Sequence, residues 1–245
     1  MGYVYSKNSV KESIDNNNVK VLYLNSANHP FLKIAKEKKI NYKIISDEEI
    51  NKLISLKGKV LHQGVVALVE DYKYYQLEEV LKAAEDRCKR DDDYPLLVMV
   101  DGLDDPHNLG AILRIVDASG ADGVIIGKNR STRLNETVAR TSTGAIEWAK
   151  VSEVTNLTQT IKLLKERGYW IVGAEYENKS IMYDEARYDM PICLVIGSEG
   201  FGVSELVKKN CDFLVKIPMK GHVNSLNASV SCGILIYEIL EKRNK

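Results

Sequence analysis

The stretch IPMKGHVNSLNASVSCGILIYEIL, residues 217–240, begins like the end of a strand and finishes as an apolar helix. Between the two lies a run of Gly, Ser and Asn. One side-chain oxygen is enough to cap a helix, yet this turn carries four suitable residues: Asn224, Ser225, Asn227 and Ser229. Two explanations are open. Either these residues only cap the helix, or the turn also binds a polar ligand.

The segment before this turn alternates strands with helices. Five apolar runs read as strands that are buried on both faces of a parallel sheet: PLLVMVDGL, ADGVIIG, YWIVGAEY, PICLVIGS and DFLVKIP. Helical stretches fall between them: NLGAILRIVDASG, NETVARTSTGAIEW, NLTQTIKLLKERG and VSELVKKN. The pattern predicts an α/β domain over residues 95–245, with a mostly parallel sheet of about five or six strands.

A smaller α/β domain is predicted over residues 1–72. Short strands are expected at 19–25, 42–46 and 62–72, with one helix before the second strand and another, capped by Ser46, after it. A charged helix over residues 73–94 is expected to link this domain to the larger one.

The composition is that of an ordinary globular protein, with 245 residues, of which 44% are hydrophobic and 28% charged. The formal net charge is zero, which argues against a strongly basic polymer-binding protein. No apolar run approaches the roughly 18–20 residues of a membrane span, and no apolar signal core is present at the start. The four cysteines form no CxxC pair, so neither a metal site nor a disulfide framework is expected. We expect a cytoplasmic protein that binds neither metal nor membrane.

Two more polar loops follow predicted strands, where open α/β sheets bind their ligands. In DGLDDPHNLGAILR, residues 101–114, Asn108 stands about where a helix cap belongs and Arg114 lies further along the same helix. In VIGSEGFGVSEL, residues 195–206, the G-x-x-G-x-G spacing matches neither the dinucleotide fingerprint nor the P-loop. Each loop alone also has a purely structural explanation. The first can be a capped helix with a surface arginine, and the second can be a turn that happens to contain Glu199.

Together, the three stretches closely resemble the motifs of the SpoU–TrmH family of RNA ribose 2′-O-methyltransferases, within the SPOUT superfamily. The matches are DPHNLGAILR, IGSEGFG and IPMKGHVNSLNASVS, in the family's order over residues 101–231. The beginning of the chain also looks like the substrate-binding module of the subgroup that methylates 23S rRNA, through YSKNSVKESI and HQGVVALV. One departure is Ser6, where that opening motif commonly has Gly.

The resemblance implies a SPOUT-type α/β trefoil-knot catalytic domain with a mostly parallel sheet, preceded by a small α/β RNA-binding domain. It implies S-adenosylmethionine as the methyl donor, bound in a bent shape at the knot. The implied cofactor-binding residues are Ile196, Gly197, Glu199, Gly200, Ile217, Met219, Ser225, Leu226 and Asn227. The implied catalytic residues are Arg114, Asn108, Glu199, Ser225 and Asn227.

Arg114 is the family's candidate for helping the ribose hydroxyl lose its proton. A guanidinium stays protonated at physiological pH, so it is a poor base. Our hypothesis is that Arg114 binds a phosphate near the target ribose and stabilises the developing alkoxide, with Asn108 and Glu199 orienting Arg114 and the ribose. His107 ranks second as a base, and His62 and His222 are expected to be structural or RNA-facing.

The partners expected from the resemblance are RNA and a second copy of the chain. The helix GILIYEILEKR carries more apolar positions than packing of one face requires. A dimer interface in the catalytic domain would explain the additional ones. The favoured substrate is a guanosine of 23S rRNA. The alternatives are tRNA ribose methylation, antibiotic-resistance methylation of rRNA and a non-catalytic RNA-binding homologue. A Rossmann enzyme is disfavoured, because no dinucleotide fingerprint follows PLLVMV.

Overall fold

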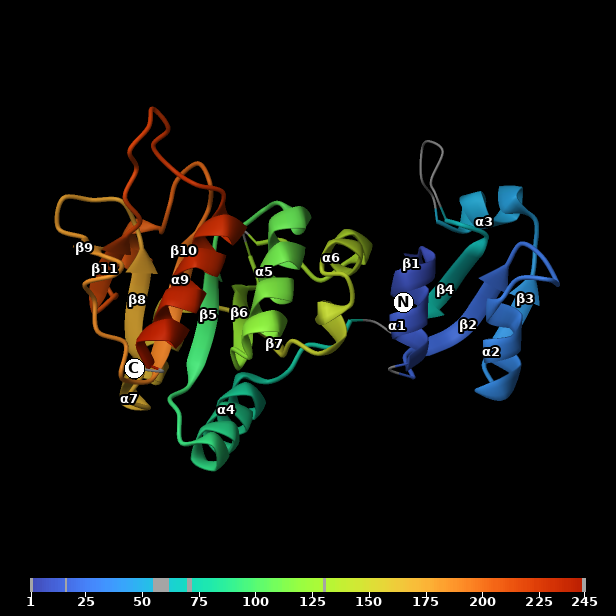
Figure 1. Ribbon diagram of the computed structural model, residues 1–245, viewed down its shortest axis with the longest axis horizontal. Coiled ribbons are helices and arrows are strands. Elements are labelled where there is room, and N and C mark those ends of the chain that lie inside the picture. Colours follow the sequence, from blue (N-terminus) through green and yellow to red (C-terminus); the bar gives the residue numbers. More distant parts are fainter. Residues whose placement is uncertain (1, 16, 55–61, 70–71, 130, 244–245) are drawn as a thin grey trace.

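The chain folds into two α/β units, each built around its own sheet (Figure 1). The computed structural model describes residues 2–15, 17–54, 62–69, 72–129 and 131–243. Within these ranges the first sheet has the strand order β1-β4-β2-β3 and the second the order β7-β6-β5-β10-β8-β11-β9. Residues 70 and 71, assigned from the sequence to the end of a strand, lie outside the described ranges.

The first unit is a mixed sheet with helices on both faces. In it β4 runs antiparallel to β1 and β2, whereas β3 runs parallel to β2. One apolar cluster joins the sheet to α1 and α2, and a second joins it to α3. The predicted cap of α3 is confirmed: Ser46 Oγ accepts a hydrogen bond from Glu49 N and the Glu49 carboxylate accepts one from Ser46 N. The elements are β1 (Gly2–Tyr5), α1 (Lys7–Asp15), β2 (Val19–Leu24), α2 (Phe31–Glu37), β3 (Asn41–Ile44), α3 (Asp47–Leu53) and β4 (Val65–Val69).

The second unit is a sheet in which every described strand pairing is parallel. Its central strand β10 is buried at all positions, as the apolar run predicted. The sequence missed β7 and β9, whose four and two residues are too short to produce a clear pattern. The strands are β5 (Leu96–Asp101), β6 (Gly123–Gly127), β7 (Val151–Val154), β8 (Trp170–Ala174), β9 (Ile181–Met182), β10 (Ile192–Gly197) and β11 (Phe213–Lys216).

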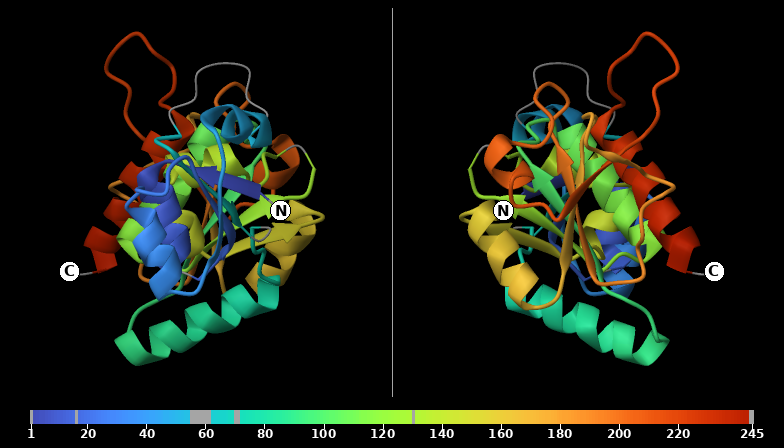
Figure 2. Two further views of the ribbon diagram at one scale, coloured as in Figure 1. Left: turned by 90° about the vertical axis from the view of Figure 1, so that its right-hand side faces the viewer. Right: turned by 90° about the vertical axis from the view of Figure 1, so that its left-hand side faces the viewer.

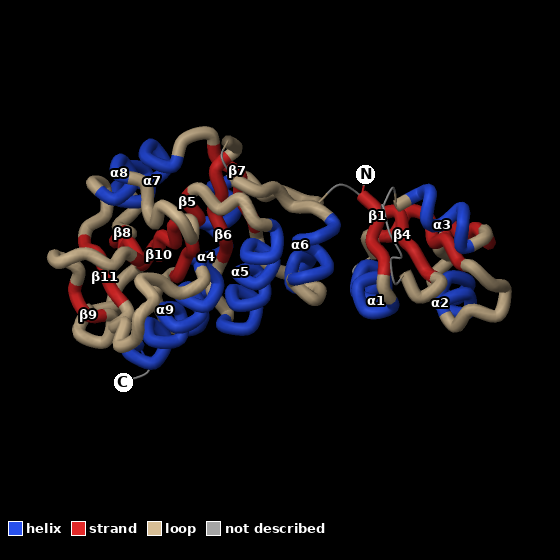
Figure 3. Tube along the Cα trace, turned by 90° about the horizontal axis from the view of Figure 1, so that it is seen from above, coloured by secondary structure: helices blue, strands red, loops and turns tan. Residues whose placement is uncertain are grey.

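Helices cover both faces of this sheet, and Figure 3 shows α5 and α9 on one side of the strands and α7 and α8 on the other. The expected linker segment forms α4, whose Val80 and Leu81 pack in the same apolar cluster as α7 and α8. The helices are α4 (Leu77–Asp91), α5 (Pro106–Ser119), α6 (Glu136–Thr141), the 3₁₀ turn η1 (Ala145–Glu147), α7 (Leu157–Glu166), α8 (Glu205–Lys208) and α9 (Ala228–Arg243).

The segment NETVARTSTGAIEW, read from the sequence as one helical stretch, is instead broken into α6 and η1. Thr143 and Gly144 take positive φ values of 50° and 99° at the break, a conformation that no α-helix continues through. Any side chain at Gly144 would also collide with Glu12 of the first unit, whose carboxyl carbon lies 2.0 Å from the position of a Cβ. The break therefore lies at the contact between the two units.

The two units meet through β1, α1 and the α6–η1 segment (Figure 1). Tyr3 N donates a hydrogen bond to Glu136 Oε1 over 2.9 Å, and Asn18 Nδ2 donates one to the Glu147 carboxylate over 3.2 Å. Burial raises the pKa of Glu12, Glu136 and Glu147. Glu12 Oε2 is buried with no hydrogen-bond partner among the described residues. This junction therefore holds carboxylates in an environment that disfavours their charged form.

We predict that Glu12→Gln raises the melting temperature at pH 7. Because the pKa of Glu12 is higher in the folded protein, its contribution to stability is fully present below the unfolded pKa and is lost as the pH rises through the folded pKa. Gln keeps the shape without that loss, so the advantage of the variant should shrink as the pH falls from 7 toward 4. Circular dichroism melts across this range measure it, with the exposed Glu166→Gln as a control. A lower melting temperature for Glu12→Gln at pH 7 would contradict the account.

Candidate active site

Three loops converge at the carboxyl edge of the second sheet. They follow β5, β10 and β11, and the last of them, residues 217–227, rises above the sheet as the orange-red loop in Figures 1 and 2. Since β5 and β10 are adjacent parallel strands, the loops after them leave the sheet side by side. The edge therefore brings together the three polar stretches that the sequence singled out.

Asn227 acts in two directions. Its carboxamide oxygen accepts hydrogen bonds from Ser229 N over 2.9 Å and Ser229 Oγ over 2.6 Å, so Asn227 caps α9. Its Nδ2 donates to Asn108 Oδ1 over 2.8 Å and to the Glu199 carboxylate. One residue thus supplies the cap, and its remaining donor ties the turn to the other two loops.

Asn108 and Glu199 complete a hydrogen-bonded triad, which consists of Asn108, Glu199 and Asn227. Asn108 Nδ2 donates to Glu199 Oε1 over 3.0 Å, and the Asn108 side chain is buried at 5% exposure. The expectation that Asn108 caps α5 is wrong: Asp105 Oδ1 accepts from His107 N, and Asn108 lies inside the first turn. Freed from capping, Asn108 can point its amide at the site.

A cavity of about 340 Å³ opens beside the triad, between loop 198–202 and segment 217–226. It mixes apolar walls from the sheet with polar groups from both loops. The backbone groups of Met219 and Leu226 have no hydrogen-bond partner among the described residues, so they are left for solvent or a ligand. Of the expected cofactor-binding residues, those that line this cavity are Ile196, Gly197, Glu199, Gly200, Ile217, Met219, Ser225 and Leu226. Asn227 lies outside the lining and contacts it through Glu199.

The glycines of GSEGFG are required by a tight loop. Ser198 and Gly202 exchange two backbone hydrogen bonds of 3.1 and 2.9 Å, and Gly202 takes a φ of 64°. A Cβ at Gly197 would lie 2.1 Å from the carbonyl carbon of Gly202. The loop folds back against its own strand, which leaves its outer face as a wall of the cavity.

Sequence reasoning missed Glu175, Tyr176 and Lys216, all of which line the cavity. Glu175 Oε2 accepts a hydrogen bond from Val203 N over 2.8 Å, so this carboxylate holds the end of the GSEGFG loop against β8. Its place in the sequence could have indicated Glu175, because it directly follows the strand run YWIVGA and so lies at the same carboxyl edge of the sheet as the three loops.

Arg114 is not in contact with the triad. It is exposed on α5 and makes no hydrogen bond or ion pair with another described residue. Six residues of α-helix separate it from Asn108, which is a rise of about 9 Å and a rotation of about 240°. The chain therefore leaves the Arg114 guanidinium available to a partner molecule.

The histidines are distributed around the site. His107 is exposed, and its Nδ1 lies 3.2 Å from Thr141 Oγ1. His222 is exposed on the 217–227 loop, whereas His62 is buried in the first unit and accepts a hydrogen bond from Gly64 N. Within the described residues, no cluster of His, Cys, Asp and Glu could hold a metal ion. The polar side chains of Asn108, Glu199 and Asn227 can position and polarise groups through hydrogen bonds.

Comparisons with known proteins identify the family of this chain. The model of the SpoU rRNA methylase family matches residues 95–237, and a model described as RNA 2′-O ribose methyltransferase substrate binding matches residues 3–75. A relative from Staphylococcus haemolyticus, assigned to the TrmH family of tRNA/rRNA methyltransferases, is 48% identical over 214 residues, covering 87% of this chain and 82% of the relative. A Bacillus subtilis relative with the same assignment is 42% identical and covers 99% of this chain and 96% of its own length.

The fold is shared with solved structures of more distant proteins. The SpoU methyltransferase AviRb from Streptomyces viridochromogenes, in complex with AdoMet, aligns with a TM-score of 0.82 at 22% identity, covering 99% of this chain and 90% of that one. The resemblance inferred from the three motifs is thus confirmed by the family models, the relatives and the fold. The chain belongs to the SpoU rRNA methylase family of RNA methyltransferases.

Proposed function

We propose that this protein transfers a methyl group from S-adenosylmethionine to the ribose 2′-hydroxyl of a guanosine in 23S rRNA. The observation that carries the proposal is the triad of Asn108, Glu199 and Asn227, which joins the three motif loops beside a cavity of ligand size. The rRNA target is supported by the family description, and RNA as the substrate by the match of residues 3–75 to a substrate-binding module. The proposed domains are 1–72 for RNA, 73–94 as linker and 95–245 for catalysis, the last with a trefoil knot.

The cavity suits S-adenosylmethionine in size and in polarity. Gly197 and Ile217 belong to its floor, and the unpaired backbone groups of Met219 and Leu226 can serve the adenine and ribose. Ser225 faces the same space from the 217–226 side. When bound, this cofactor supplies an already activated methyl group.

The chain itself must align the ribose hydroxyl and stabilise the negative charge that develops as its proton leaves. We assign the second task to Arg114, which binds a phosphate of the RNA next to the target ribose. Asn108 and Glu199 orient the ribose, because their polar atoms are fixed by the triad. The proton passes to a phosphate oxygen or to water, with His107 as the second candidate.

We further propose a homodimer through the catalytic domain. On α9, which packs against α5, Val230 and Tyr237 remain 48% and 53% exposed seven residues apart on one side of the helix. Arg114 is exposed on the neighbouring α5. Burial of this face against a second copy would explain its apolar side chains, and sedimentation equilibrium that found only monomer would contradict it.

The protein is proposed to work in the cytoplasm on RNA. Among the described residues, no helix is long and apolar enough to span a bilayer. Methylation of tRNA is the second candidate, since the relatives are assigned to tRNA/rRNA methyltransferases. A binding protein without catalysis is disfavoured, because the triad is complete and Arg114 is present.

We predict that Gly197→Ala weakens S-adenosylmethionine binding by at least about tenfold. The added methyl group would overlap the backbone of Gly202 and push loop 198–202 out of place. Isothermal titration calorimetry measures the affinity, with Gly221→Ala as the matched control, because a Cβ there meets nothing within 4 Å. Equal affinities for the two variants would show that the loop does not shape the cofactor pocket.

The function is tested by methyl transfer from tritiated S-adenosylmethionine to undermodified 23S rRNA, 16S rRNA and tRNA. We expect label in 23S rRNA and a loss of about 10²-fold in turnover for Arg114→Lys, with cofactor affinity unchanged. Arg90→Lys, on the distant helix α4, is the control and should keep turnover. Near-normal turnover of Arg114→Lys would sink its assigned role, and label in tRNA alone would overturn the target.

A further inference from the structure

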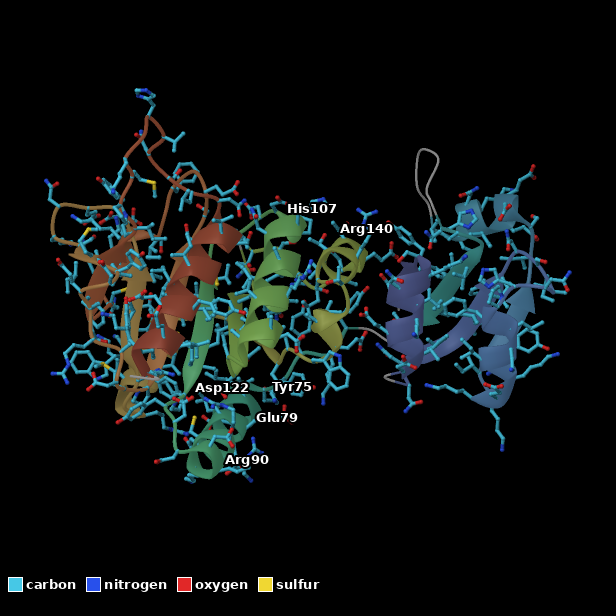
Figure 4. The ribbon with its side chains drawn as sticks, viewed as in Figure 1. Tyr75, Glu79, Arg90, His107, Asp122 and Arg140 are labelled. Carbon is cyan, nitrogen blue, oxygen red and sulfur yellow. The ribbon has the colours of Figure 1, made fainter. Side chains whose placement is uncertain are left out.

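A row of polar side chains, His107, Thr141 and Arg140, lies between the triad and the first unit. We call this row the edge. His107, adjacent to Asn108 in the chain, lies at the start of α5 and contacts Thr141 at the end of α6. Arg140 precedes Thr141. Figure 4 shows His107 and Arg140 on the upper edge of the catalytic domain, with Arg140 on the side of the first unit. The edge is therefore continuous up to the junction of the two units.

Arg140 crosses that junction. Its Nη1 donates a hydrogen bond to Tyr5 Oη over 3.2 Å, and its Cζ lies 5.7 Å from the centre of the Tyr5 ring. The side chain is exposed and forms no ion pair within the described part of the chain. A guanidinium has five N–H donors, and within the described residues this one donates a single hydrogen bond, to Tyr5. Its other N–H groups have no partner among those residues and can donate to a bound molecule.

The first unit continues the edge beyond Tyr5. Ser6 has a φ of 95°, which turns the chain sharply into α1 and leaves Lys7 exposed at the start of that helix. Lys7 N donates to Gln63 Oε1 over 3.0 Å, and Gln63 O lies 3.2 Å from His29 Nε2. The first unit therefore presents the exposed Lys7 side chain as a cation close in the chain to Tyr5.

The remainder of the junction is unsuited to a polyanion. Burial raises the pKa of Glu12 and of Glu147, and the nearby charge of Glu147 raises the pKa of Glu12 further. Glu136 accepts from the backbone of Tyr3 nearby. Arg140 and Lys7 are exposed cations that can attract a phosphate chain crossing between the units, whereas any carboxylate that ionises in the rest of the junction would repel it.

We propose that RNA passes from the first unit to the triad along this edge, and that Arg140 holds a phosphate of the RNA at the crossing. Tyr5 orients the guanidinium through its hydroxyl, and the free N–H groups form a charge-assisted pair with two phosphate oxygens. The inference rests on the proposed function, since it needs RNA as the substrate. It assigns Arg140 as a positioning residue that fixes where the strand enters the site.

The test measures binding of the methyl-accepting RNA by the full-length protein over a salt series, together with the KM for RNA. For Arg140→Gln we expect a KM raised about tenfold, unchanged affinity for S-adenosylmethionine, and a plot of log K against log salt whose slope falls by about 1. Arg140→Lys keeps the charge and should keep the slope. Arg90→Gln, at the lower edge of the catalytic domain in Figure 4, is the matched control and should resemble the wild type.

Tyr5→Phe separates RNA binding from a merely structural fastening of the two units. It removes the hydroxyl that Arg140 contacts but leaves the charge, so we expect the salt slope to stay unchanged. Equal effects of Tyr5→Phe and Arg140→Gln on slope and KM would show that Arg140 only fastens the units, and would overturn the inference. An unchanged slope and KM for Arg140→Gln would overturn it as well. If the wild type labels no RNA, the proposed function fails together with it.

Discussion

The carboxamide of Asn227 is the interaction on which the site depends. Its oxygen ends the 217–227 loop by capping α9, and its nitrogen binds the Asn108 and Glu199 side chains. Because a carboxamide is planar, fixing the oxygen at the helix end also fixes the direction of the nitrogen. Asn227 therefore ties the start of α9 to the loops that carry Asn108 and Glu199, and the Glu199 loop forms part of the cavity wall.

The sheet makes this arrangement possible. Strands β5 and β10 are paired in parallel and buried, so the loops that carry Asn108 and Glu199 begin from neighbouring, rigid positions. Glu175, at the end of β8, holds the same edge from the other side by accepting from Val203 N. The GSEGFG loop is therefore held at both ends, by β10 and by Glu175, and forms one wall of the cavity.

The sequence predicted the features that depend on local pattern. The longer apolar strands of the second unit, the cap at Ser46 and the three motif loops were visible, because periodicity and turn chemistry are local properties. The features that the sequence did not predict depend on contacts between segments that are distant in the chain. The break between α6 and η1 lies where Glu12 of the first unit approaches Gly144, and Asn108 is free for the triad because Asp105 takes over the cap.

Two other positions show the same limit. Ser6 departs from the glycine common in the resembling motif, yet it adopts the positive φ that glycine favours, so the turn is kept at some conformational cost. Arg114 was grouped with the triad by its motif, but the helix turns it away from Asn108. The motif places Arg114 and Asn108 in one reaction, but it does not show whether the two side chains meet in the free protein or only through a bound molecule.

The most direct test of the central claim is a double-mutant cycle on Asn108 and Asn227. Methyl transfer to the accepting RNA would be measured in a single turnover at saturating cofactor for Asn108→Ala, Asn227→Ala and the double variant. If the triad acts as one unit, the second substitution adds little to the first, with a coupling free energy of about 1 kcal/mol or more. Losses that simply add would show that the two side chains act independently, and would contradict the account.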